Sequence, residues 1–465
     1  MIPERMRAPS SEPAPSPWLD RLPPAAPAPP LEGELRVDAA VVGAGYSGLH
    51  AALALRERGL SVALLEAHSA GFGASGRNAG HVTPTIGKDL PTLLAVYGRE
   101  GARELVRFAE AAIAYTEETL ARLAARGADA HYRPTGNVAA AVHPRQAERL
   151  RRTAETIEAL GAHASYLDPE AMRKRGLPEA FACGVLEGAG GTLDPARYAR
   201  GLRDEAVAAG VRLFEATPVV GLEDGARLAL RTPRGHVRAE HVVLALNAYA
   251  PDAGVLRRRL LRGYVSLFET RPLTPEERAS VGWPGEEGIY TAHEILESYR
   301  LTARGSIVGG SKHLRYGFAG RALPDEAPAV FDLITRTFRE RFPTLSGVEV
   351  ERCWSGPIAF TLDFLPALGR LPERPRVAYA AGYAGHGVAL ASHCGRLAAG
   401  LALGDPDARA AAAPLTERFR PPLPPEPFRW LLVRGLTGLF GAVDARLDRA
   451  ARAWLASGGA DGRRP

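Results

Sequence analysis

The stretch from Asp38 to Glu66 constrains the fold of this chain more than any other segment. It reads DAAVVGAGYSGLHAALALRERGLSVALLE: an apolar run, glycines in the spacing G-x-G-x-x-G, an Ala/Leu-rich segment and a second apolar run. The pattern predicts a buried strand, a tight turn, a helix over Leu49 to Arg58 and a second buried strand. Such a unit binds a dinucleotide, with the pyrophosphate at the helix N-terminus, where free N–H groups favour an anion.

Each residue of this fingerprint has a physical task. Gly43 permits the tight turn, Gly45 lets the backbone approach a pyrophosphate, and Gly48 lets helix and strand pack closely. Glu66 ends the second strand, where its carboxylate can accept hydrogen bonds from an adenosine ribose. A glycine-rich loop without function is the alternative. The nucleotide site is favoured because both strands, the helix and the acidic residue stand in register.

Length and composition narrow the class of protein. The chain has 465 residues, enough for about two or three domains. Its formal net charge is +6, and its positive charges, almost all of them arginine, are spread along the chain, which argues against nucleic-acid binding. Cys183, Cys353 and Cys394 lie far apart, which indicates neither a disulfide framework nor a metal site. The N-terminal region lacks the apolar core of a signal peptide, so we expect a cytoplasmic protein.

Two further glycine-rich segments favour a flavin over a nicotinamide. The first, AHSAGFGASGRNAGHV, follows the second strand and can contact the ribityl chain and ring of an extended cofactor. The second, AAGYAGHGVALASHCG, lies far along the chain and reads as a strand, a glycine-rich turn and a helix start. The partial positive charge of that helix start suits the N1–O2 edge of a reduced flavin. We therefore expect FAD bound across the molecule.

Together with LALNAYAP, these motifs resemble those of the FAD-dependent D-amino-acid-oxidase-like superfamily. SGRNAG and RCWSGPIAFTLDFLPALG are most similar to its gamma-glutamylputrescine oxidoreductase branch, and the resemblance covers residues 36 to 405. It implies an α/β fold, in which a Rossmann-like, glutathione-reductase-like FAD-binding domain is interleaved with an α+β substrate domain built on an antiparallel sheet. It also implies oxidation of a C–N bond of a primary or secondary amine or amino acid by hydride transfer to flavin N5. The expected product is an imine, then an aldehyde or keto compound, and O2 is the expected oxidant of the reduced flavin.

The resemblance also assigns residues to the cofactor site. They are Gly43, Gly45, Tyr46, Ser47, Gly48 and Glu66 for the ADP half, Ser75, Arg77, Asn78 and Ala79 for the loop beside the ring, Asn247 for a turn near the nucleotide, and Gly382, Gly385, His386, Gly387 and Val388 for the ring-end loop. For Arg77 the alternative is a structural pairing with a carboxylate, and for His386 a loop position facing solvent. His81 either borders the active site or has a capping or strand role.

Some relatives attach FAD covalently through cysteine or histidine, and this chain offers one candidate of each. His81 falls three places after Asn78, which is the wrong position for a histidyl link. Cys353 lies in the region of the cysteinyl link, but its spacing to Asp363 is too long, and a buried, inert thiol is the better interpretation. We therefore expect FAD to bind non-covalently, and we expect no metal ion.

Residues that act on the substrate should come from the alternating segments between 260 and 320. Arg300 can clamp a substrate carboxylate with two hydrogen bonds, and Lys312 near the flavin can promote reaction with O2 by its charge. His386 is the third catalytic candidate. Further candidates, either polar groups or walls of an amine pocket, are His293, Tyr299, Trp354, Phe360 and Tyr383.

The expected organisation interleaves two domains. A Pro-rich tail (1–33), with Trp18 and Leu19 as anchor points, precedes an FAD-binding domain (34–95, 165–255 and 345–405) and a substrate domain (96–164 and 256–344). The extension 406–465 carries an amphipathic helix, whose apolar face consists of Phe428, Leu431, Leu432, Leu436, Leu439, Phe440, Val443 and Leu447. Packing of this face against the body is the first interpretation, and contact with a membrane surface is the second.

Three alternatives to an oxidase are open at this point. A dehydrogenase of the same fold would pass electrons to a quinone or another carrier, and the terminal helix would favour it. A non-catalytic FAD-binding protein or a flavin-dependent tRNA-modifying relative is the second, although the dispersed charge argues against tRNA. An NAD-dependent dehydrogenase is the third, and it would carry no yellow chromophore. The expected partners are a small-molecule amine and either O2 or an electron carrier.

Overall fold

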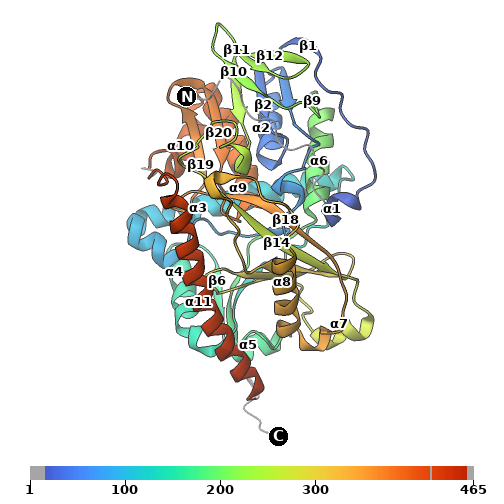
Figure 1. Ribbon diagram of the computed structural model, residues 1–465, viewed down its shortest axis with the longest axis vertical. Coiled ribbons are helices and arrows are strands. Elements are labelled where there is room, and N and C mark those ends of the chain that lie inside the picture. The colour runs from blue at the N-terminus through green and yellow to red at the C-terminus, as the bar shows by residue number, and fades with distance from the viewer. Residues whose placement is uncertain (1–15, 419–420, 458–465) are drawn as a thin grey trace.

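Two sheets organise the chain. The computed structural model describes residues 16–418 and 421–457. In Figure 1 a six-stranded sheet with its helices occupies the upper half, and an eight-stranded sheet with its helices occupies the lower half. The helices are α1 (Pro17–Asp20), α2 (Tyr46–Glu57), α3 (Leu90–Ala125), α4 (Ala147–Ala159), α5 (Pro169–Lys174), α6 (Pro195–Ala208), α7 (Pro275–Val281), α8 (Pro328–Arg341), α9 (Gly387–Leu403), α10 (Pro406–Thr416) and α11 (Phe428–Ala456).

The six-stranded sheet is the predicted Rossmann-like layer, in the order β19-β20-β13-β2-β3-β9. Its strands are β2 (Ala39–Val42), β3 (Val62–Leu65), β9 (Arg212–Phe214), β13 (His241–Leu244), β19 (Ala367–Leu371) and β20 (Arg374–Ala381). All neighbours are parallel except β19 and β20. Every residue of β2 and β3 is buried, as expected for parallel strands covered on both faces. The predicted α/β fold class is confirmed.

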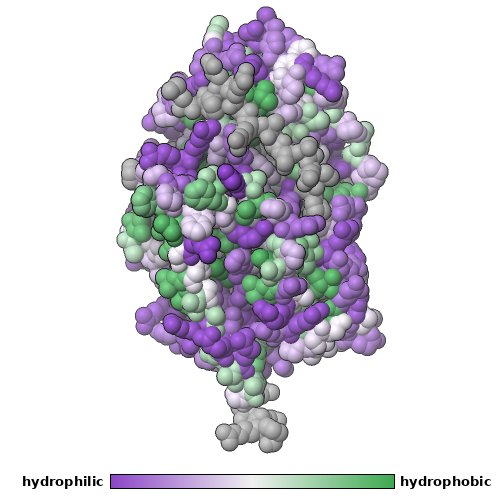
Figure 2. Space-filling model, viewed as in Figure 1, coloured by the Kyte–Doolittle hydropathy of each residue, from purple (hydrophilic) through white to green (hydrophobic). Residues whose placement is uncertain are grey.

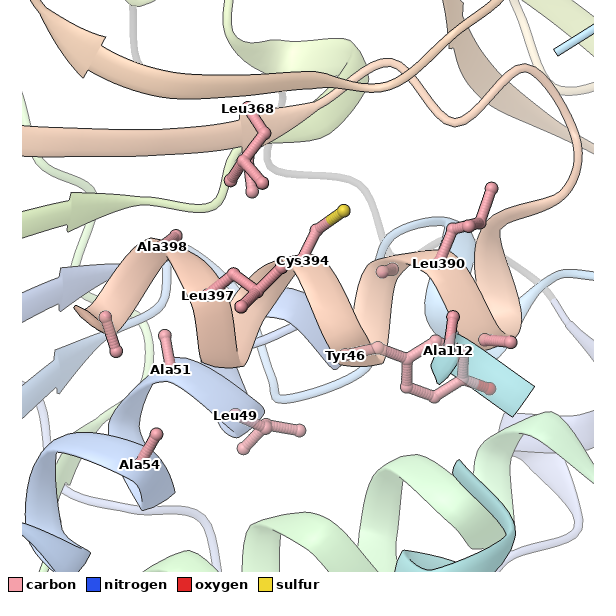
Figure 3. Close-up of a cluster of buried hydrophobic side chains, with 14 of the residues drawn as sticks. Tyr46, Leu49, Ala51, Ala54, Ala112, Leu368, Leu390, Cys394, Leu397 and Ala398 are labelled. Carbon is pink, nitrogen blue, oxygen red and sulfur yellow. The ribbon is translucent and has the colours of Figure 1, made fainter. Parts of the chain in front are cut away.

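Helices α2 and α9 cross on this sheet. Figure 3 shows α9 between Leu368 of the sheet and Leu49 of α2, both of them buried. The crossing needs a glycine, because a Cβ atom at Gly395 would lie 2.2 Å from the carbonyl oxygen of Ser47. Each leucine buried here stabilises the fold by about 2 kcal/mol. The two helices start at Tyr46 and Gly387, and both of these residues line one cavity.

The eight-stranded sheet carries the predicted substrate domain, in the order β18-β14-β17-β16-β15-β5-β7-β6. Its strands are β5 (Asn137–Ala141), β6 (Ala164–Leu167), β7 (Cys183–Glu187), β14 (Leu261–Thr270), β15 (Gly288–Thr291), β16 (Glu297–Leu301), β17 (Ile307–Ser311) and β18 (Val350–Phe360). All neighbours are antiparallel except β15 and β5. Strands β7 and β18 fall in segments that the sequence assigned to the FAD-binding domain. They belong to this sheet because they pair with β5 and β14 along their length.

Two smaller sheets complete the topology. Strands β1 (Gly33–Arg36), β12 (Gly235–Ala239), β11 (Leu228–Arg231) and β10 (Gly221–Glu223) form a four-stranded sheet in that order, seen at the top of Figure 1. Strands β4 (His81–Val82) and β8 (Gly191–Thr192) form a two-stranded sheet. The β4–β8 pair fixes the end of the glycine-rich loop that follows Glu66 next to the eight-stranded sheet.

The described part of the N-terminal tail is anchored as predicted. Trp18 is buried, its Nε1 donates a hydrogen bond to the carbonyl oxygen of Asn78 at 3.1 Å, and its ring meets Trp354 edge to face. Leu19 packs beside it in the same apolar cluster. Residues 1–15 of the predicted tail lie outside the described residues.

The predicted packing of the apolar face of α11 against the body is wrong. Six of the eight residues assigned to that face are exposed, whereas Val433, Leu447 and Ala451 are buried. Polar contacts explain this orientation. Asp444 and Asp448 of α11 bind partners on the domain of the eight-stranded sheet, and the face of the helix that carries these aspartates therefore points inward. Across the described ranges, no helix combines the length and the apolar character that crossing a bilayer requires.

Candidate active site

A cavity of about 1510 Å³ extends from the six-stranded to the eight-stranded sheet. Small-molecule sites usually measure about 300–1,000 Å³, so this one has room for a large cofactor together with a substrate. Every residue predicted to bind the cofactor lines the cavity except Gly48 and Gly382. Trp354, Phe360 and Tyr383, the predicted apolar walls, line it as well.

The dinucleotide fingerprint forms the turn that its spacing predicts. Gly43 has a φ of 98°, and a Cβ atom there would lie 2.7 Å from the carbonyl oxygen of Ala245. Gly45 caps α2. A Cβ atom at Gly48 would lie 1.7 Å from the carbonyl oxygen of Gly43, so Gly48 serves the packing of helix against turn and does not line the cavity.

Glu66 lies at the edge where β2 and β3 end. Its carboxylate accepts the backbone N–H of Ala44 at 2.7 Å and that of His68 at 3.0 Å, and burial raises its pKa. Glu66 therefore holds the turn of the fingerprint and also faces the cavity. Its bond to an adenosine ribose stays a prediction.

The glycine-rich loop after β3 is joined to the fingerprint. Ser75 Oγ accepts the N–H of Tyr46 at 2.9 Å. Asn78 ties the loop to itself, because its Oδ1 accepts the N–H of Gly80 at 2.8 Å and its Nδ2 donates to the carbonyl oxygen of Ala74 at 3.0 Å. Arg77 is buried and pairs with Asp325 at 2.9 Å, so the structural pairing considered for it is present, although the residue also lines the cavity.

The ring-end loop is also tied to the nucleotide turn. Asn247 Oδ1 accepts the N–H of Gly382 at 3.0 Å, and the hydroxyl groups of Ser47 and Tyr383 lie 2.5 Å apart. His386 is half-buried at the N-cap position of α9 and lines the cavity, and its contact with the flavin edge stays a prediction. Burial lowers its pKa to about 4, so its ring is neutral at pH 7.

Arg300 lies behind the loop beside the ring, outside the residues that line the large cavity. Its Nε donates to the carbonyl oxygen of Ala79, and its guanidinium group lies 4.8 Å from the centre of the Trp18 ring. Burial lowers its pKa to about 10. Arg300 and Trp18 thus hold the loop from its far side, and its predicted place as a clamp for a substrate carboxylate has no support in this geometry.

Lys312 also lies away from the cavity lining, in a buried ion cluster. Its Nζ is 2.7 Å from Glu297 and 2.9 Å from Asp448, and Arg341 contacts the same two carboxylates. His293 borders the cluster and lines the cavity, whereas Tyr299, another predicted substrate residue, belongs to the apolar core. Two cations neutralise the two carboxylates, so the cluster is an ion-pair network and not a cation site.

Three polar residues of the cavity region were missing from the sequence analysis. Glu187 and Tyr290 line the cavity, and the Tyr290 hydroxyl donates to Glu187 Oε2 at 2.8 Å. Asn137 lies between their strands and accepts a hydrogen bond from His81 through its Oδ1 at 3.0 Å. They come from three separate strands, and no local motif marks any of them.

A family model described as FAD dependent oxidoreductase matches residues 38–401. The chain belongs to this family. A curated relative of this FAD dependent oxidoreductase is the gamma-glutamylputrescine oxidoreductase of Escherichia coli (strain K12), which is 32% identical over 378 residues and aligned over 81% of this chain and 85% of the relative. The glycine oxidase of Bacillus subtilis (strain 168) is 28% identical over 40% of this chain and 48% of its own length.

Two solved structures illustrate the shared fold. Glycine oxidase from Geobacillus kaustophilus superposes with a TM-score of 0.68 at 23% identity, covering 80% of this chain and 95% of that one. L-proline dehydrogenase from P. horikoshii gives a TM-score of 0.67 at 20% identity, covering 80% and 94%. The predicted family and enzyme class are confirmed.

The residues of the cavity fit FAD. Buried ring nitrogens of His68, His81 and His386 line it, and these nitrogens have no hydrogen-bond partner within the described ranges. A buried polar atom without a partner is costly, so these nitrogens suit contacts with a polar ligand. Gly43 and Gly45 line the cavity at the N-terminus of α2, the end of a helix that favours an anion such as a pyrophosphate.

We expect the FAD of this enzyme to be released by acid. Cys353 does not line the cavity, and burial raises the pKa of its thiol, which makes the nucleophilic thiolate scarce. Acid precipitation of the yellow holoenzyme should therefore leave a colourless pellet and a yellow supernatant. A yellow pellet would contradict non-covalent binding, and a His81→Asn variant would then show whether the cavity-facing histidine is the attachment point.

Proposed function

We propose that this enzyme oxidises the C–N bond of a primary or secondary amine, or of an amino acid, to an imine that hydrolyses to an aldehyde or keto product. When bound, FAD supplies the oxidising power by accepting two electrons from the substrate. The proposal rests on three polar side chains that line the cofactor cavity, those of Glu187, Tyr290 and His81. Together they suit the binding and deprotonation of a substrate ammonium group.

His81 presents a bare nitrogen to the cavity. Asn137 Nδ2 donates to the carbonyl oxygen of Val82 at 2.8 Å, so the amide turns its Oδ1 toward His81. An oxygen only accepts, so His81 Nδ1 carries the proton of that bond. Burial lowers the pKa of His81 to about 4, which keeps the ring neutral and leaves Nε2 unprotonated. Nε2 is thus an acceptor for a substrate N–H.

Strand register places Glu187 beside this histidine. Asn137 pairs with Glu187 on one side and with Gly288 on the other, so the three share a position across β7, β5 and β15. A Cβ atom at Gly288 would lie 2.5 Å from His81 Nδ1, and the glycine therefore leaves space for the ring. Tyr290 is two residues farther along β15, on the same face.

Glu187 has the properties of a base. Burial raises its pKa to about 7, which is the range where a side chain exchanges protons efficiently near neutral pH. Its carboxylate attracts a substrate ammonium and accepts one of its protons, which leaves an amine with a free lone pair. The Tyr290 hydroxyl holds one carboxylate oxygen in place during this transfer.

The remaining walls favour an amine with an apolar stem. Trp354, Phe360 and Tyr383 line the cavity and can cover methylene groups and exclude water. The activity named for the Escherichia coli relative supports a gamma-glutamyl derivative of a polyamine as the first substrate to test. Glycine, sarcosine and D-amino acids are the next.

Two candidate functions differ only in the electron acceptor that reoxidises the flavin. Our first proposal is O2, with release of H2O2. An amine dehydrogenase that passes electrons to a quinone or other carrier is the second, and two observations favour it. Lys312, the predicted promoter of the O2 reaction, is neutralised in the ion cluster, and α11 exposes an apolar face next to the cavity.

The proposed function predicts that an amine bleaches the yellow enzyme. The holoenzyme is mixed, in the absence of O2, with each of the candidate amines and amino acids named above. The true substrate should remove the visible absorbance of the flavin and yield an aldehyde or keto product. Admitting O2 and measuring H2O2 then separates the two acceptors. If no amine or amino acid bleaches the enzyme, the proposed function is wrong.

A further inference from the structure

Helix α11 carries an exposed apolar stripe, defined here as Phe428, Leu431, Leu432, Leu436, Leu439 and Val443. These are six of the ten large apolar side chains that are exposed in the described part of the chain. Spacings of three and four residues place them on one side of the helix. In Figure 2 hydrophobic residues gather over the upper part of α11, which is the part where the stripe lies.

The contacts of α11 with the body hold the stripe outward. Asp444 accepts the backbone N–H groups of Glu294 and Ile295, both at 2.9 Å. Asp448 belongs to the ion cluster of Lys312 and Arg341. Rolling the helix to cover the stripe would pull both aspartates away from these partners, which makes the exposure a property of the folded enzyme.

Charge on the outer side of α11 has one sign. Asp444 and Asp448 are its only acidic residues, and both are buried against the body. The exposed charged residues of the helix are Arg434, Arg446, Arg449 and Arg452. Arg452 pairs with Glu340 of α8, and Arg434 covers the ring of Trp430. An apolar stripe flanked by arginine suits an interface that is apolar inside and anionic at its surface.

We propose that α11 is a membrane-docking helix, which lies in the surface of an anionic bilayer with the apolar stripe among the lipid headgroups. The arginines would then meet lipid phosphates. A second copy of the chain is a poorer partner, because a two-fold interface on this helix would bring rows of arginine together. The proposal does not depend on the identity of the substrate.

Docking would set the cavity beside the membrane. Val433, Thr437 and Phe440 of α11 line the cavity, and so do Leu432 and Leu436 at one edge of the stripe. One helix therefore forms both a wall of the active site and the membrane contact. A lipid-soluble electron carrier would then meet the enzyme close to its cofactor.

Vesicle sedimentation tests the proposal with the full holoenzyme. Vesicles of phosphatidylcholine mixed with phosphatidylglycerol should bind the enzyme at least tenfold more tightly than vesicles of phosphatidylcholine alone, and salt should weaken the binding. The Val443→Glu and Leu439→Glu variants should each lose at least tenfold in affinity. Val207→Glu is the matched control, because Val207 is an exposed valine on α6, away from the stripe, and its variant should bind like the original.

Folding of each variant is checked by its bound FAD and its melting temperature, which do not require vesicles. Equal binding to both kinds of vesicle, or equal effects of Val443→Glu and Val207→Glu, would overturn the proposal. So would a dimer seen by light scattering that Leu439→Glu dissociates, if the enzyme does not bind vesicles. If the original enzyme binds anionic vesicles but oxidises no amine, the proposed function is wrong and the docking proposal stands.

Discussion

Replacing Glu187 with glutamine is expected to lower kcat/KM for the amine substrate by about 100-fold at pH 8, as removal of a general base typically does. In the original enzyme kcat/KM should rise with pH through about 7, because burial raises the pKa of Glu187 to that value and the carboxylate is the active form. The variant should lack this rise. Both effects are measured from steady-state rates between about pH 5.5 and about pH 9, a range that extends about 1.5–2 units to either side of that pKa.

The same substitution is expected to stabilise the fold at pH 8. Burial raises the pKa of Glu187 in the folded state above its ordinary value of 4.5, so folding favours the protonated form. The contribution of Glu187 to the free energy of unfolding is complete below about pH 4.5 and is lost as the pH rises through about 7. Glutamine stays neutral and can still accept the hydrogen bond of Tyr290. Above pH 7 the variant should be more stable by about 3 kcal/mol, seen as a higher melting temperature.

Glu205 supplies the matched control. It is also a buried glutamate, but it is paired with Arg122 at 2.9 Å and Arg126 at 2.8 Å. Glu205→Gln should therefore lower the melting temperature and leave kcat/KM unchanged. A Glu187→Gln variant that loses stability and keeps its activity would show that Glu187 has only a structural role.

Local signals predicted the cofactor half of the molecule. The fingerprint from Gly43 to Gly48 combines backbone requirements that neighbouring residues meet together, so its spacing alone predicts the turn and the helix. The ring-end turn at Gly385 has the same local character. Their meeting in one cavity follows from the expectation that FAD binds across the molecule, and both motifs line the cavity.

The substrate half was less predictable because it depends on strand register. Glu187, Asn137 and Tyr290 come together only when β7, β5 and β15 pair as they do, and a shift of one residue would turn them to the other face. Lys312 illustrates the opposite error. Its position in an alternating segment suggested a place near the flavin, but carboxylates on β16 and α11 hold it elsewhere.

The orientation of α11 was unpredictable for a related reason. Amphipathic spacing identifies an apolar face, but it does not show whether the body or another surface covers that face. Two aspartates, Asp444 and Asp448, decide the question through backbone and side-chain partners that lie about 100 to 150 residues earlier in the chain. Polar residues on a helix thus determined its orientation where the apolar pattern suggested the reverse.

Replacing Arg341 with methionine is expected to destabilise the enzyme by about 3–5 kcal/mol. Arg341 is buried and donates to both oxygens of Glu297 at 2.9 Å, and it also contacts Asp448. Arg341 and Lys312 hold the pKa of the Glu297 carboxyl group below its usual range, and the hydrogen bond of His293, with Lys312 and Arg341, does the same for Asp448. Without Arg341, two buried carboxylates would share one lysine, and α11 would lose part of its attachment.

Differential scanning calorimetry and hydrogen exchange measure this effect. The melting temperature should fall by several degrees, and amide exchange in α11 should rise before exchange in the six-stranded sheet does. Arg452→Met is the control, because Arg452 forms an exposed ion pair with Glu340 at 2.9 Å, and such pairs contribute about 0–1 kcal/mol. If the two variants melt alike, the buried cluster does not secure α11, and the outward orientation of the apolar stripe needs another cause.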